Sequence, residues 1–349
     1  MPIYPLDRIV RSRAPLRLGL AGGGTDVSPY CDTYGGAILN ATINLFARTT
    51  LEPAPAGKII LDARDLDAYE ELESAGELET TGPLKLLKGV YNRIIKDYQL
   101  PPLSLKMTTY VDVPKGSGLG SSSTIVTSII GAFAEWLNLP LGEYEIAHLA
   151  YEIERLDLGL AGGRQDQYAA TFGGFNFMEF YAQDKVIVNP LRIKPEYKNE
   201  LEFNLLLYYT GTSRESANII DIQRSNFTAG AEATLQAAHG LKEQAIRMKE
   251  AILRGQLHEI GLILDYGWEQ KKRMAQGISN TRIDDIYGAA RAAGAIGGKI
   301  SGAGGGGFFT IFCPGTSRFK VQRALESFGG QFLPYQFTEE GMISWSVPK

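Results

Sequence analysis

Two segments within the first fifty residues have the alternating pattern of β-strands. Between residues 9 and 20, apolar positions alternate loosely with basic or small ones, and residues 35–50 are rich in β-branched side chains. A period of two places every second side chain on the same face of a sheet, so both segments are predicted strands. The first strand runs into a tight loop formed by the glycines that precede Asp26.

Spacings of three and four residues between apolar positions predict helices in both halves of the chain. The segments predicted as helices are 84–99, 121–136, 141–155, 241–252 and 283–293. Residues 103–113 alternate again as a strand, and residues 307–313 form another strand that leaves a glycine loop. Because strand 103–113 is followed by glycines and then by the helix at 121, a loop at a helix N-terminus is predicted there.

The length of the chain predicts two domains. A chain of 349 residues exceeds the size at which a single hydrophobic core stops growing. A more polar stretch with Pro190 and Pro195 follows the glycine pair Gly173-Gly174, and it marks the expected boundary. We therefore predict an N-terminal domain at residues 1–186 and a C-terminal domain at residues 187–349, both with mixed helices and strands of the α+β class.

Composition and charge exclude several classes of protein. The net charge of −4 offers no general attraction for nucleic acid or an anionic membrane, so neither is an expected partner. Two cysteines, Cys31 and Cys313, are too few for a disulfide framework. No apolar run has membrane-spanning length, and the N-terminus lacks the apolar core of a signal peptide, so a cytoplasmic protein is expected.

The loop at residues 114–123 carries the strongest chemical signal. Its sequence is Pro114-Lys115-Gly116-Ser117-Gly118-Leu119-Gly120-Ser121-Ser122-Ser123. Unpaired N–H groups and the helix dipole favour an anion at such a position, and glycines allow phosphate oxygens to approach the backbone. The serines that begin the helix could donate hydroxyls, ligate Mg²⁺, or serve only as a helix cap. The sequence fits neither the Walker A nor the dinucleotide-binding fingerprint.

Three glycine motifs resemble those of the galactokinase, homoserine kinase, mevalonate kinase and phosphomevalonate kinase superfamily, the GHMP kinases. Residues 114–123 resemble its P-x-x-x-G-L-G-S-S-[A/S] motif, residues 14–26 its N-terminal motif, and residues 299–308 its C-terminal K-x-S-G-A-G-G-G-G motif. The resemblance extends over nearly the whole chain in the order of the family. It implies the two-domain GHMP-kinase fold, with mixed sheets packed by helices and an active site in the cleft between the domains.

The resemblance also implies roles for individual residues, with ATP and Mg²⁺ as nucleotide and metal. Asp166 corresponds to the catalytic aspartate, which acts as a base or orients the acceptor, and Arg17 to a residue near the transferred phosphoryl group. Ser122 and Glu154 correspond to the metal ligands, and the backbone from Pro114 to Ser122 to the ATP phosphate site. The residues implied on the substrate side are Gly23, Gly24, Thr25, Asp26, Arg164, Gly304 and Gly305.

Within the superfamily, the chain resembles the D-glycero-D-manno-heptose 7-phosphate kinases. The variants A-G-G-G-T-D, G-S-G-L-G-S-S-S and G-G-R-Q-D-Q-Y-A-A occur together with a W-x-x-K-K segment at residues 268–272. Galactokinases have Glu-His in place of Gly23-Gly24, which argues against galactose. The resemblance implies a small-molecule sugar phosphate as partner, phosphorylated at its anomeric hydroxyl to the 1,7-bisphosphate for nucleotide-activated heptose and surface polysaccharide synthesis.

Other hypotheses remain open at the level of the sequence. An L-fucose or uronic-acid kinase, a homoserine or mevalonate kinase, and a non-catalytic sugar sensor share the glycine loops, because a fold does not fix a function. A dinucleotide-dependent redox enzyme is a further hypothesis, but this chain lacks the third glycine of the dinucleotide-binding fingerprint. A substrate that carries a phosphate also needs a cation away from ATP. The candidates, which the sequence does not rank, are Arg164, Lys115, Arg13 and Arg48.

Overall fold

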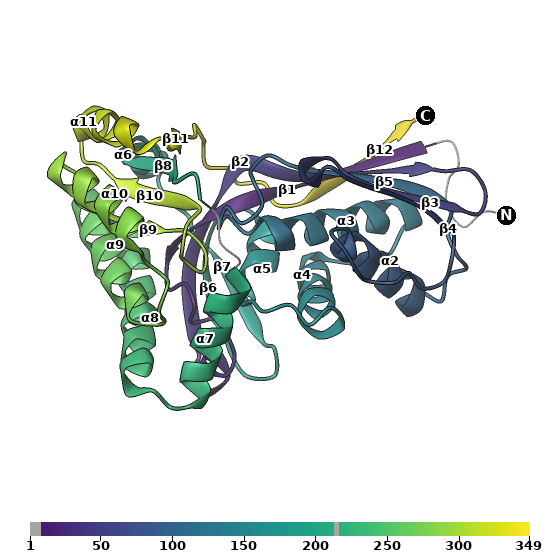
Figure 1. Cartoon of the computed structure of the whole chain (residues 1–349), viewed down its shortest axis with the longest axis horizontal. Coiled ribbons are helices and arrows are strands. Elements are labelled where there is room, and N and C mark those ends of the chain that lie inside the picture. Colours follow the sequence, from purple (N-terminus) through teal and green to yellow (C-terminus); the bar gives the residue numbers. More distant parts are fainter. Residues whose placement is uncertain (1–7, 213–215) are drawn as a thin grey trace.

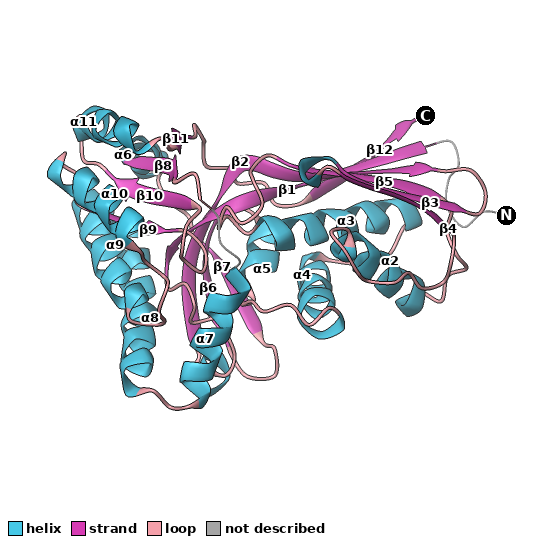
Figure 2. Ribbon diagram, in the orientation of Figure 1, coloured by secondary structure: helices cyan, strands magenta, loops and turns pink. Residues whose placement is uncertain are grey.

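The structure is a computed structural model that describes residues 8–212 and 216–349. The first seven residues of the predicted N-terminal domain therefore lie outside the described residues. Two sheets, each packed with helices, make up the fold (Figures 1 and 2). This arrangement confirms the predicted α+β class with mixed sheets.

The larger sheet is built mainly from the first half of the chain. Its strands are, in spatial order, β12 (Ile343–Pro348), β1 (Arg8–Ala21), β2 (Gly36–Pro53), β5 (Leu105–Val111), β3 (Lys58–Ala63) and β4 (Ala68–Glu73), and β6 (Phe175–Phe180) and β7 (Val186–Pro190) extend it from β2. All neighbours are antiparallel except β3 and β5. The predicted strands at 9–20, 35–50 and 103–113 are confirmed as β1, β2 and β5.

Helices cover one face of the larger sheet (Figure 2). They are α2 (Lys85–Asp97), α3 (Ser121–Leu137), α4 (Glu143–Glu152) and α5 (Gln165–Phe172), and the short α1 (Tyr30–Tyr34) precedes β2. Helix α3 is buried along most of its length, since it packs on β1 and β2 and is itself covered by α4 and α5. Its small and apolar residues suit this central position. The helices predicted at 84–99 and 121–136 are confirmed.

The smaller sheet lies in the second half of the chain. Its order is β11 (Gln331–Phe332), β8 (Leu205–Tyr209), β10 (Phe308–Phe312) and β9 (Gly297–Ile300). The helices of this half are α6 (Pro195–Asn204), α7 (Ser216–Thr228), α8 (Glu232–Arg254), α9 (Leu257–Lys272), α10 (Thr281–Ala292) and α11 (Ser317–Leu325). The predicted helices at 241–252 and 283–293 are confirmed within α8 and α10, and the strand at 307–313 as β10.

Helix α9 is not among the helices predicted from the sequence, and it runs without a break through glycines at residues 261 and 267. A Cβ atom on Gly267 would lie 1.8 Å from Nε2 of Gln244 in α8, and one on Gly261 would lie 2.5 Å from Cγ1 of Ile296, just before β9. These glycines therefore allow α9 to pack closely against its neighbours rather than ending the helix.

The last strand returns to the first half of the chain. Strand β12 pairs with β1 from Arg8↔Pro348 to Arg13↔Ile343, so both ends of the described chain lie in the larger sheet (Figure 1). Strand β7, which begins at Val186, belongs to the same sheet. The division into residues 1–186 and 187–349 stays a prediction, and the pairing places β7 and β12, which lie at or beyond its boundary, in the larger sheet.

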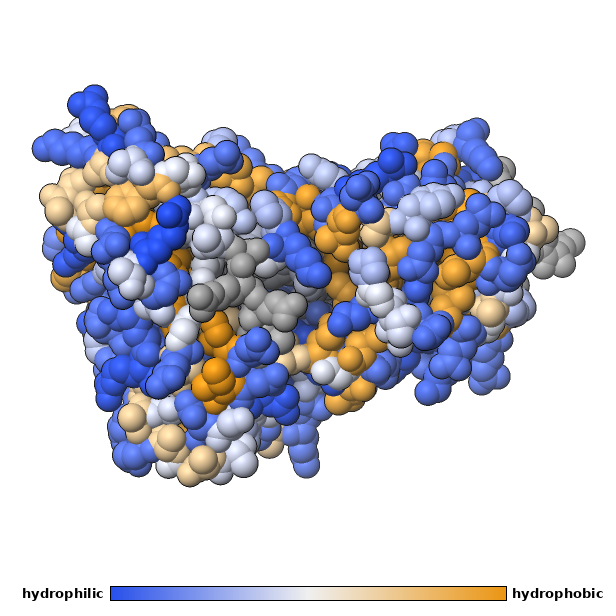
Figure 3. All heavy atoms as spheres, in the orientation of Figure 1, coloured by the Kyte–Doolittle hydropathy of each residue, from blue (hydrophilic) through white to orange (hydrophobic). Residues whose placement is uncertain are grey.

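None of the helices among the described residues combines the length and apolar character needed to cross a membrane. On the face drawn in Figure 3, polar side chains predominate and apolar ones form separate patches over both halves of the chain.

Candidate active site

The glycine loop between β5 and α3 has the backbone of an anion site. Gly116, Gly118 and Gly120 have φ angles of 76°, 82° and 79°, values that L-residues rarely adopt. Where residues with positive φ alternate with residues of negative φ, their successive N–H groups point into a shared hollow, called a nest, that binds anions. Gly120 is the N-cap of α3 and carries no capping side chain. The N–H groups of the first turn of this 17-residue helix are therefore suited to a phosphate group.

The C-terminal glycine motif, residues 299–308, contacts this loop directly. The N–H of Phe308 donates to the carbonyl of Ser117 at 2.9 Å. A Cβ atom on Gly118 would lie 2.4 Å from the carbonyl oxygen of Ser301, and one on Gly302 would lie 2.8 Å from Cα of Gly118. The two loops thus contact each other backbone to backbone, which glycine alone permits at these positive φ angles.

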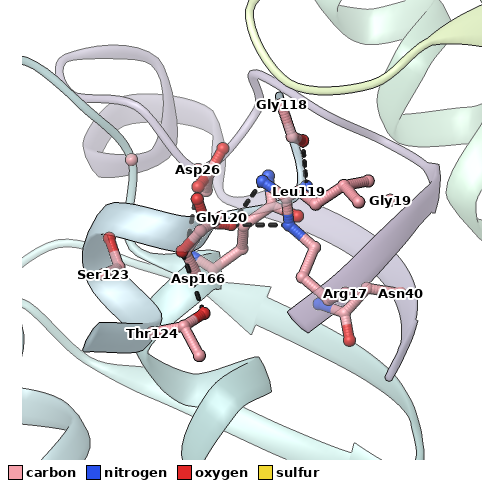
Figure 4. A network of polar contacts seen from close by, with 12 residues as sticks. Arg17, Gly19, Asp26, Asn40, Gly118, Leu119, Gly120, Ser123, Thr124 and Asp166 are labelled. Atoms are coloured by element: carbon pink, nitrogen blue, oxygen red, sulfur yellow. Dashed lines mark hydrogen bonds and ion pairs between the residues drawn. The ribbon is translucent and has the colours of Figure 1, made fainter. Parts of the chain in front are cut away.

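Arg17 connects three elements at the centre of the site (Figure 4). From β1, its Nε and Nη2 atoms lie 2.7 Å and 2.6 Å from Oδ1 of Asp166, and its Nη1 donates to the carbonyl of Gly118 at 2.6 Å. The Arg17 residue is 4% exposed, whereas 23% of the Asp166 side chain remains exposed. The predicted pair is therefore brought together beside the glycine loop at residues 114–123, and Asp166 is its more exposed member.

Asp26 fixes the helix that carries Asp166. Its Oδ2 atom accepts the backbone N–H groups of Arg164 at 2.8 Å and Gln165 at 3.1 Å, at the start of α5. A carboxylate is stabilised at a helix N-terminus by the dipole and the free N–H groups. A Cβ atom on Gly163 would lie 1.9 Å from the same Oδ2, so glycine is needed for this contact.

Glu154 lies in a π-helical turn, Ile153–Asp157, that follows α4. The prediction of one helix over 141–155 thus differs in its last turn, where the wider π geometry replaces the α-helix. Glu154 is 1% exposed, and Nε2 of Gln167 donates both to Glu154 Oε2 at 2.5 Å and to Ser123 Oγ at 3.1 Å. Ser123 rather than the exposed Ser122 is linked in this way to Glu154.

This carboxylate fits a Mg²⁺ ion shared with nucleotide phosphates. Mg²⁺ is usually held by one or two carboxylates together with phosphate oxygens and waters. Glu154 supplies one buried carboxylate next to the first turn of α3, where Ser122 and Ser123 carry hydroxyl groups. The part of the chain that the structure describes has no cluster of three or more His, Cys, Asp or Glu side chains suited to a metal. The donor set thus suits a metal shared with ATP.

Arg164 points away from this centre. Its guanidinium donates to the carbonyl of Tyr181 at 2.8 Å and forms ion pairs with Asp32 at 3.1 Å and Asp184 at 2.8 Å. Its charge is therefore already compensated by protein carboxylates. Two other basic candidates for binding a substrate phosphate are similarly engaged, since Arg13 pairs with Glu340 and Arg48 with Asp112. Lys115 is exposed.

The remaining predicted substrate residues have structural contacts. The Thr25 hydroxyl donates to the carbonyls of Gly22 and Ala37 and accepts the N–H of Ala37, so it closes the first glycine loop. The N–H of Gly305 donates to the carbonyl of Ile278 at 2.9 Å, and a Cβ atom on Gly304 would meet Ile278 at 2.8 Å. Gly23 and Gly24 lie beside two lysines that the sequence did not single out as functional.

These lysines, Lys271 in α9 and Lys299 in β9, approach the first glycine loop from the second half of the chain. Lys271 Nζ donates to the carbonyl of Gly23 at 3.2 Å, and Lys299 Nζ donates to that of Gly19 at 2.8 Å. The signal that could have found Lys271 is its spacing from Trp268, which places it on the buried face of α9.

Comparison with known proteins defines the class. Residues 85–174 match the N-terminal domain of GHMP kinases, and residues 248–331 match the GHMP kinase C-terminal domain. The chain belongs to the GHMP kinases, which are ATP-dependent phosphotransferases. The predicted resemblance and fold are thereby confirmed, and the redox alternative is not favoured.

Two relatives are similar over almost the whole chain. One is D-glycero-alpha-D-manno-heptose 7-phosphate kinase from Campylobacter jejuni, 51% identical over 97% of this chain and 100% of its own. The other is the crystal structure of a D-glycero-D-manno-heptose 1-phosphate kinase from Bacteriodes thetaiotaomicron, 48% identical, with a TM-score of 0.84 over 97% of this chain and 100% of that one. L-fucokinase/L-fucose-1-P guanylyltransferase from Bacteroides fragilis is 29% identical over 86% of this chain, which covers 34% of that protein.

Proposed function

We propose that the protein transfers the γ-phosphoryl group of ATP to the anomeric hydroxyl of D-glycero-D-manno-heptose 7-phosphate. The product is the 1,7-bisphosphate, a precursor of nucleotide-activated heptose for surface polysaccharide. The observation that supports the chemistry most directly is the Arg17–Asp166 pair, held against Gly118 of the phosphate loop. The heptose substrate is supported by the 51% identity to the Campylobacter jejuni kinase. Fucose or a uronic acid is the less favoured acceptor.

The phosphate loop and Glu154 would position the nucleotide. The backbone of residues 116–121 binds the ATP phosphates, and Glu154 with the hydroxyl of Ser122 holds Mg²⁺. The metal, when bound, neutralises charge on the phosphate oxygens. The hydrogen bond from Gln167 orients the Glu154 carboxylate. Phosphoryl transfer depends mainly on such positioning and charge stabilisation, because the protein forms no covalent bond in it.

Asp166 and Arg17 would act on the reacting groups. The two contacts that Arg17 makes with Asp166 both go to Oδ1. We therefore assign Oδ2 of Asp166 to accept the proton of the sugar hydroxyl. The Arg17 guanidinium then faces the negative charge that develops on the transferred phosphoryl group. Oδ2 of Asp26 accepts backbone N–H groups at the start of α5, and we assign its Oδ1 to accept hydrogen bonds from sugar hydroxyls. Gly23 and Gly24 leave room for a substrate bulkier than galactose.

Localisation and partners follow from this chemistry. We propose that the protein works in the cytoplasm, where ATP is available and its two buried free cysteines stay reduced. ATP and a sugar phosphate are the proposed small-molecule partners.

An acceptor panel tests the proposal. ATP consumption is measured with Mg²⁺ and heptose 7-phosphate, heptose 1-phosphate, mannose, L-fucose, galacturonate, homoserine or mevalonate. We expect turnover with heptose 7-phosphate and a ³¹P spectrum of the product that shows a phosphate on C1. The names of the two similar kinases differ in the position of the phosphate. Turnover on the 1-phosphate, which has no free anomeric hydroxyl, would contradict the assignment, and ligand binding without turnover would favour a sensor.

Removing the charge of Glu154 should weaken the use of Mg²⁺. Glu154→Gln keeps the shape of the side chain but removes the carboxylate that we assign to the metal. We expect the Mg²⁺ concentration for half-maximal activity to rise at least about 10-fold, measured by titration of activity at saturating ATP. Glu152→Gln is the matched control, because Glu152 pairs with Arg93 at 2.5 Å. An unchanged Mg²⁺ requirement in Glu154→Gln would exclude Glu154 as a ligand.

A further inference from the structure

Two buried lysines of the site lack the carboxylate partner that a buried cation normally requires. Lys271 is 5% exposed and Lys299 is 8% exposed, and both ammonium groups donate to backbone carbonyls. Among the described residues, neither takes part in an ion pair. Lys88, which is equally buried, pairs with Glu70 at 2.7 Å. Because an unpaired buried charge is costly, the two unpaired lysines require an explanation that Lys88 does not.

The lysines converge on the first glycine motif. A Cβ atom on Gly24 would lie 3.0 Å from Lys271 Nζ, whereas one on Gly23 would lie 3.7 Å from Lys299 Nζ. Gly19 is also near Lys299, at 3.8 Å by the same measure. Because glycine has no side chain, none of these three residues places side-chain atoms between its own backbone and the ammonium groups.

Unsatisfied amide groups surround the same place. Gln165 Oε1 is buried without a hydrogen-bond partner in the described structure, and it lies 3.7 Å from the position of a Cβ on Gly19. Gln223 is 1% exposed, its Nε2 likewise lacks a partner, and its Oε1 lies 3.5 Å from a Cβ position on Gly24. Buried polar atoms are normally satisfied, so such groups indicate a polar ligand.

The charges of this region favour an anion. The charged groups that act on the two lysines are Asp26, which faces Lys271, and Arg17, which faces Lys299. Asp166 is bonded to Arg17, and Asp26 uses one oxygen on the backbone of α5. Burial lowers the pKa of Lys299 to about 7, with further lowering by Lys271 and Arg17. Burial also lowers the pKa of Lys271 to about 8, against the opposing effect of Asp26. A dianion between them would favour both charged forms.

We propose that Lys271 and Lys299 bind the phosphate that the acceptor sugar already carries, an inference that rests on the proposed function. The lysines contact the first glycine motif through the carbonyls of Gly23 and Gly19, whereas Gly118 of the loop that we assign to ATP contacts the Arg17 guanidinium. Gly19 and Arg17 are two residues apart on β1, a separation of roughly 7 Å along a strand. A sugar with its reacting hydroxyl at Asp166 can thus extend its phosphorylated end toward the lysines.

The test compares the same heptose with and without its 7-phosphate. In Lys271→Met and Lys299→Met, which keep the apolar stem, we expect KM for heptose 7-phosphate to rise about 10- to 100-fold, since hydrogen bonds to charged groups are among the stronger ones. The rise in KM should be at least about 10-fold smaller for unphosphorylated heptose than for heptose 7-phosphate. Lys272→Met is the matched control, because Lys272 is the next residue and pairs with Glu269 at 2.7 Å. Equal losses on both sugars would overturn the proposal.

A binding measurement separates this proposal from the proposed function. If the wild-type protein turns over neither heptose, the heptose assignment fails, but the phosphate site can still be tested with inorganic phosphate. With the ATP site saturated by a non-hydrolysable ATP analogue, phosphate should raise the Tm of the wild-type protein and not that of the double methionine variant. An equal rise in both proteins would overturn the lysine assignment whatever the substrate.

The pH dependence of stability gives an independent readout. The lysine pKa values in the folded protein, about 7 and about 8, lie below the ordinary value of about 10.4 in the unfolded chain. Between pH 7 and 10 the unfolded chain therefore binds more protons, so these groups make the free energy of unfolding increase with pH. The wild-type protein should show this increase relative to the double methionine variant, and bound phosphate should reduce it. An equal effect of phosphate on the pH profiles of both proteins would overturn the proposal.

Discussion

Asp166→Asn is expected to lower kcat by about 10²- to 10⁴-fold, because the amide cannot accept the proton of the sugar hydroxyl. Asparagine keeps the size of the side chain and an oxygen that can accept a bond from Arg17, which holds Asp166 at 2.6 Å to 2.7 Å. KM for ATP should change little, since the phosphate loop is untouched. The measurement is steady-state kinetics with ATP and heptose 7-phosphate over a range of pH.

Asp157→Asn is the control for this change. Asp157 is also an acidic residue of the same half of the chain, but it is more exposed and pairs with Arg93 at 3.1 Å. Its substitution should leave kcat unchanged. If Asp166→Asn retained full turnover, Asp166 would be an orienting group and not the base.

Arg17→Met is expected to lower kcat by about 10²- to 10³-fold, the usual effect of removing one donor to developing negative charge. The change removes the hydrogen bonds to Asp166 and to the carbonyl of Gly118. The proposed base and the proposed phosphate loop are then no longer held in position by Arg17. Arg11→Met is the matched control, because Arg11 lies on the same strand and is exposed. A loss of kcat equal to that of the control would remove Arg17 from the proposed mechanism.

The double variant Arg17→Met, Asp166→Asn should lose less activity than the product of the two single losses. Residues in one hydrogen-bonded network couple, and groups that act as a unit in catalysis are not additive. Circular dichroism and the unfolding transition of each variant check that the fold is retained. Multiplicative losses would indicate that the two residues act independently.

Sequence patterns predicted the elements that have a clean local period. Strands β1, β2 and β5 and helices α2, α3, α8 and α10 follow from spacings of two or of three and four residues. The return of β12 to the edge of β1 could not be predicted in this way, because pairing between distant segments leaves no local period. Helix α9 is not among the predicted helices, and its Gly261 and Gly267 provide room for neighbouring side chains.

Motif order indicated which side chains lie together in the structure, whereas residue type did not indicate which charges are already paired. The predicted pair of Arg17 and Asp166 lies together beside the phosphate loop. The charge of Arg164 gave no hint that Asp32 and Asp184 already compensate it. Lys271 and Lys299 lie in two of the quoted motifs, but lysines are usually exposed, so only their burial and missing carboxylate partners in the structure distinguish them.

The backbone contact between Gly118 and Gly302 has a consequence for recombination between related genes. Each glycine stands where a Cβ atom would collide with the loop of the other half, at 2.4 Å and 2.8 Å. The two loops therefore constrain each other's sequence although they lie far apart along the chain. A chimaera that joins the first half of this protein, with Gly118, to the second half of a relative would keep this backbone contact only where that second half carries glycine at position 302.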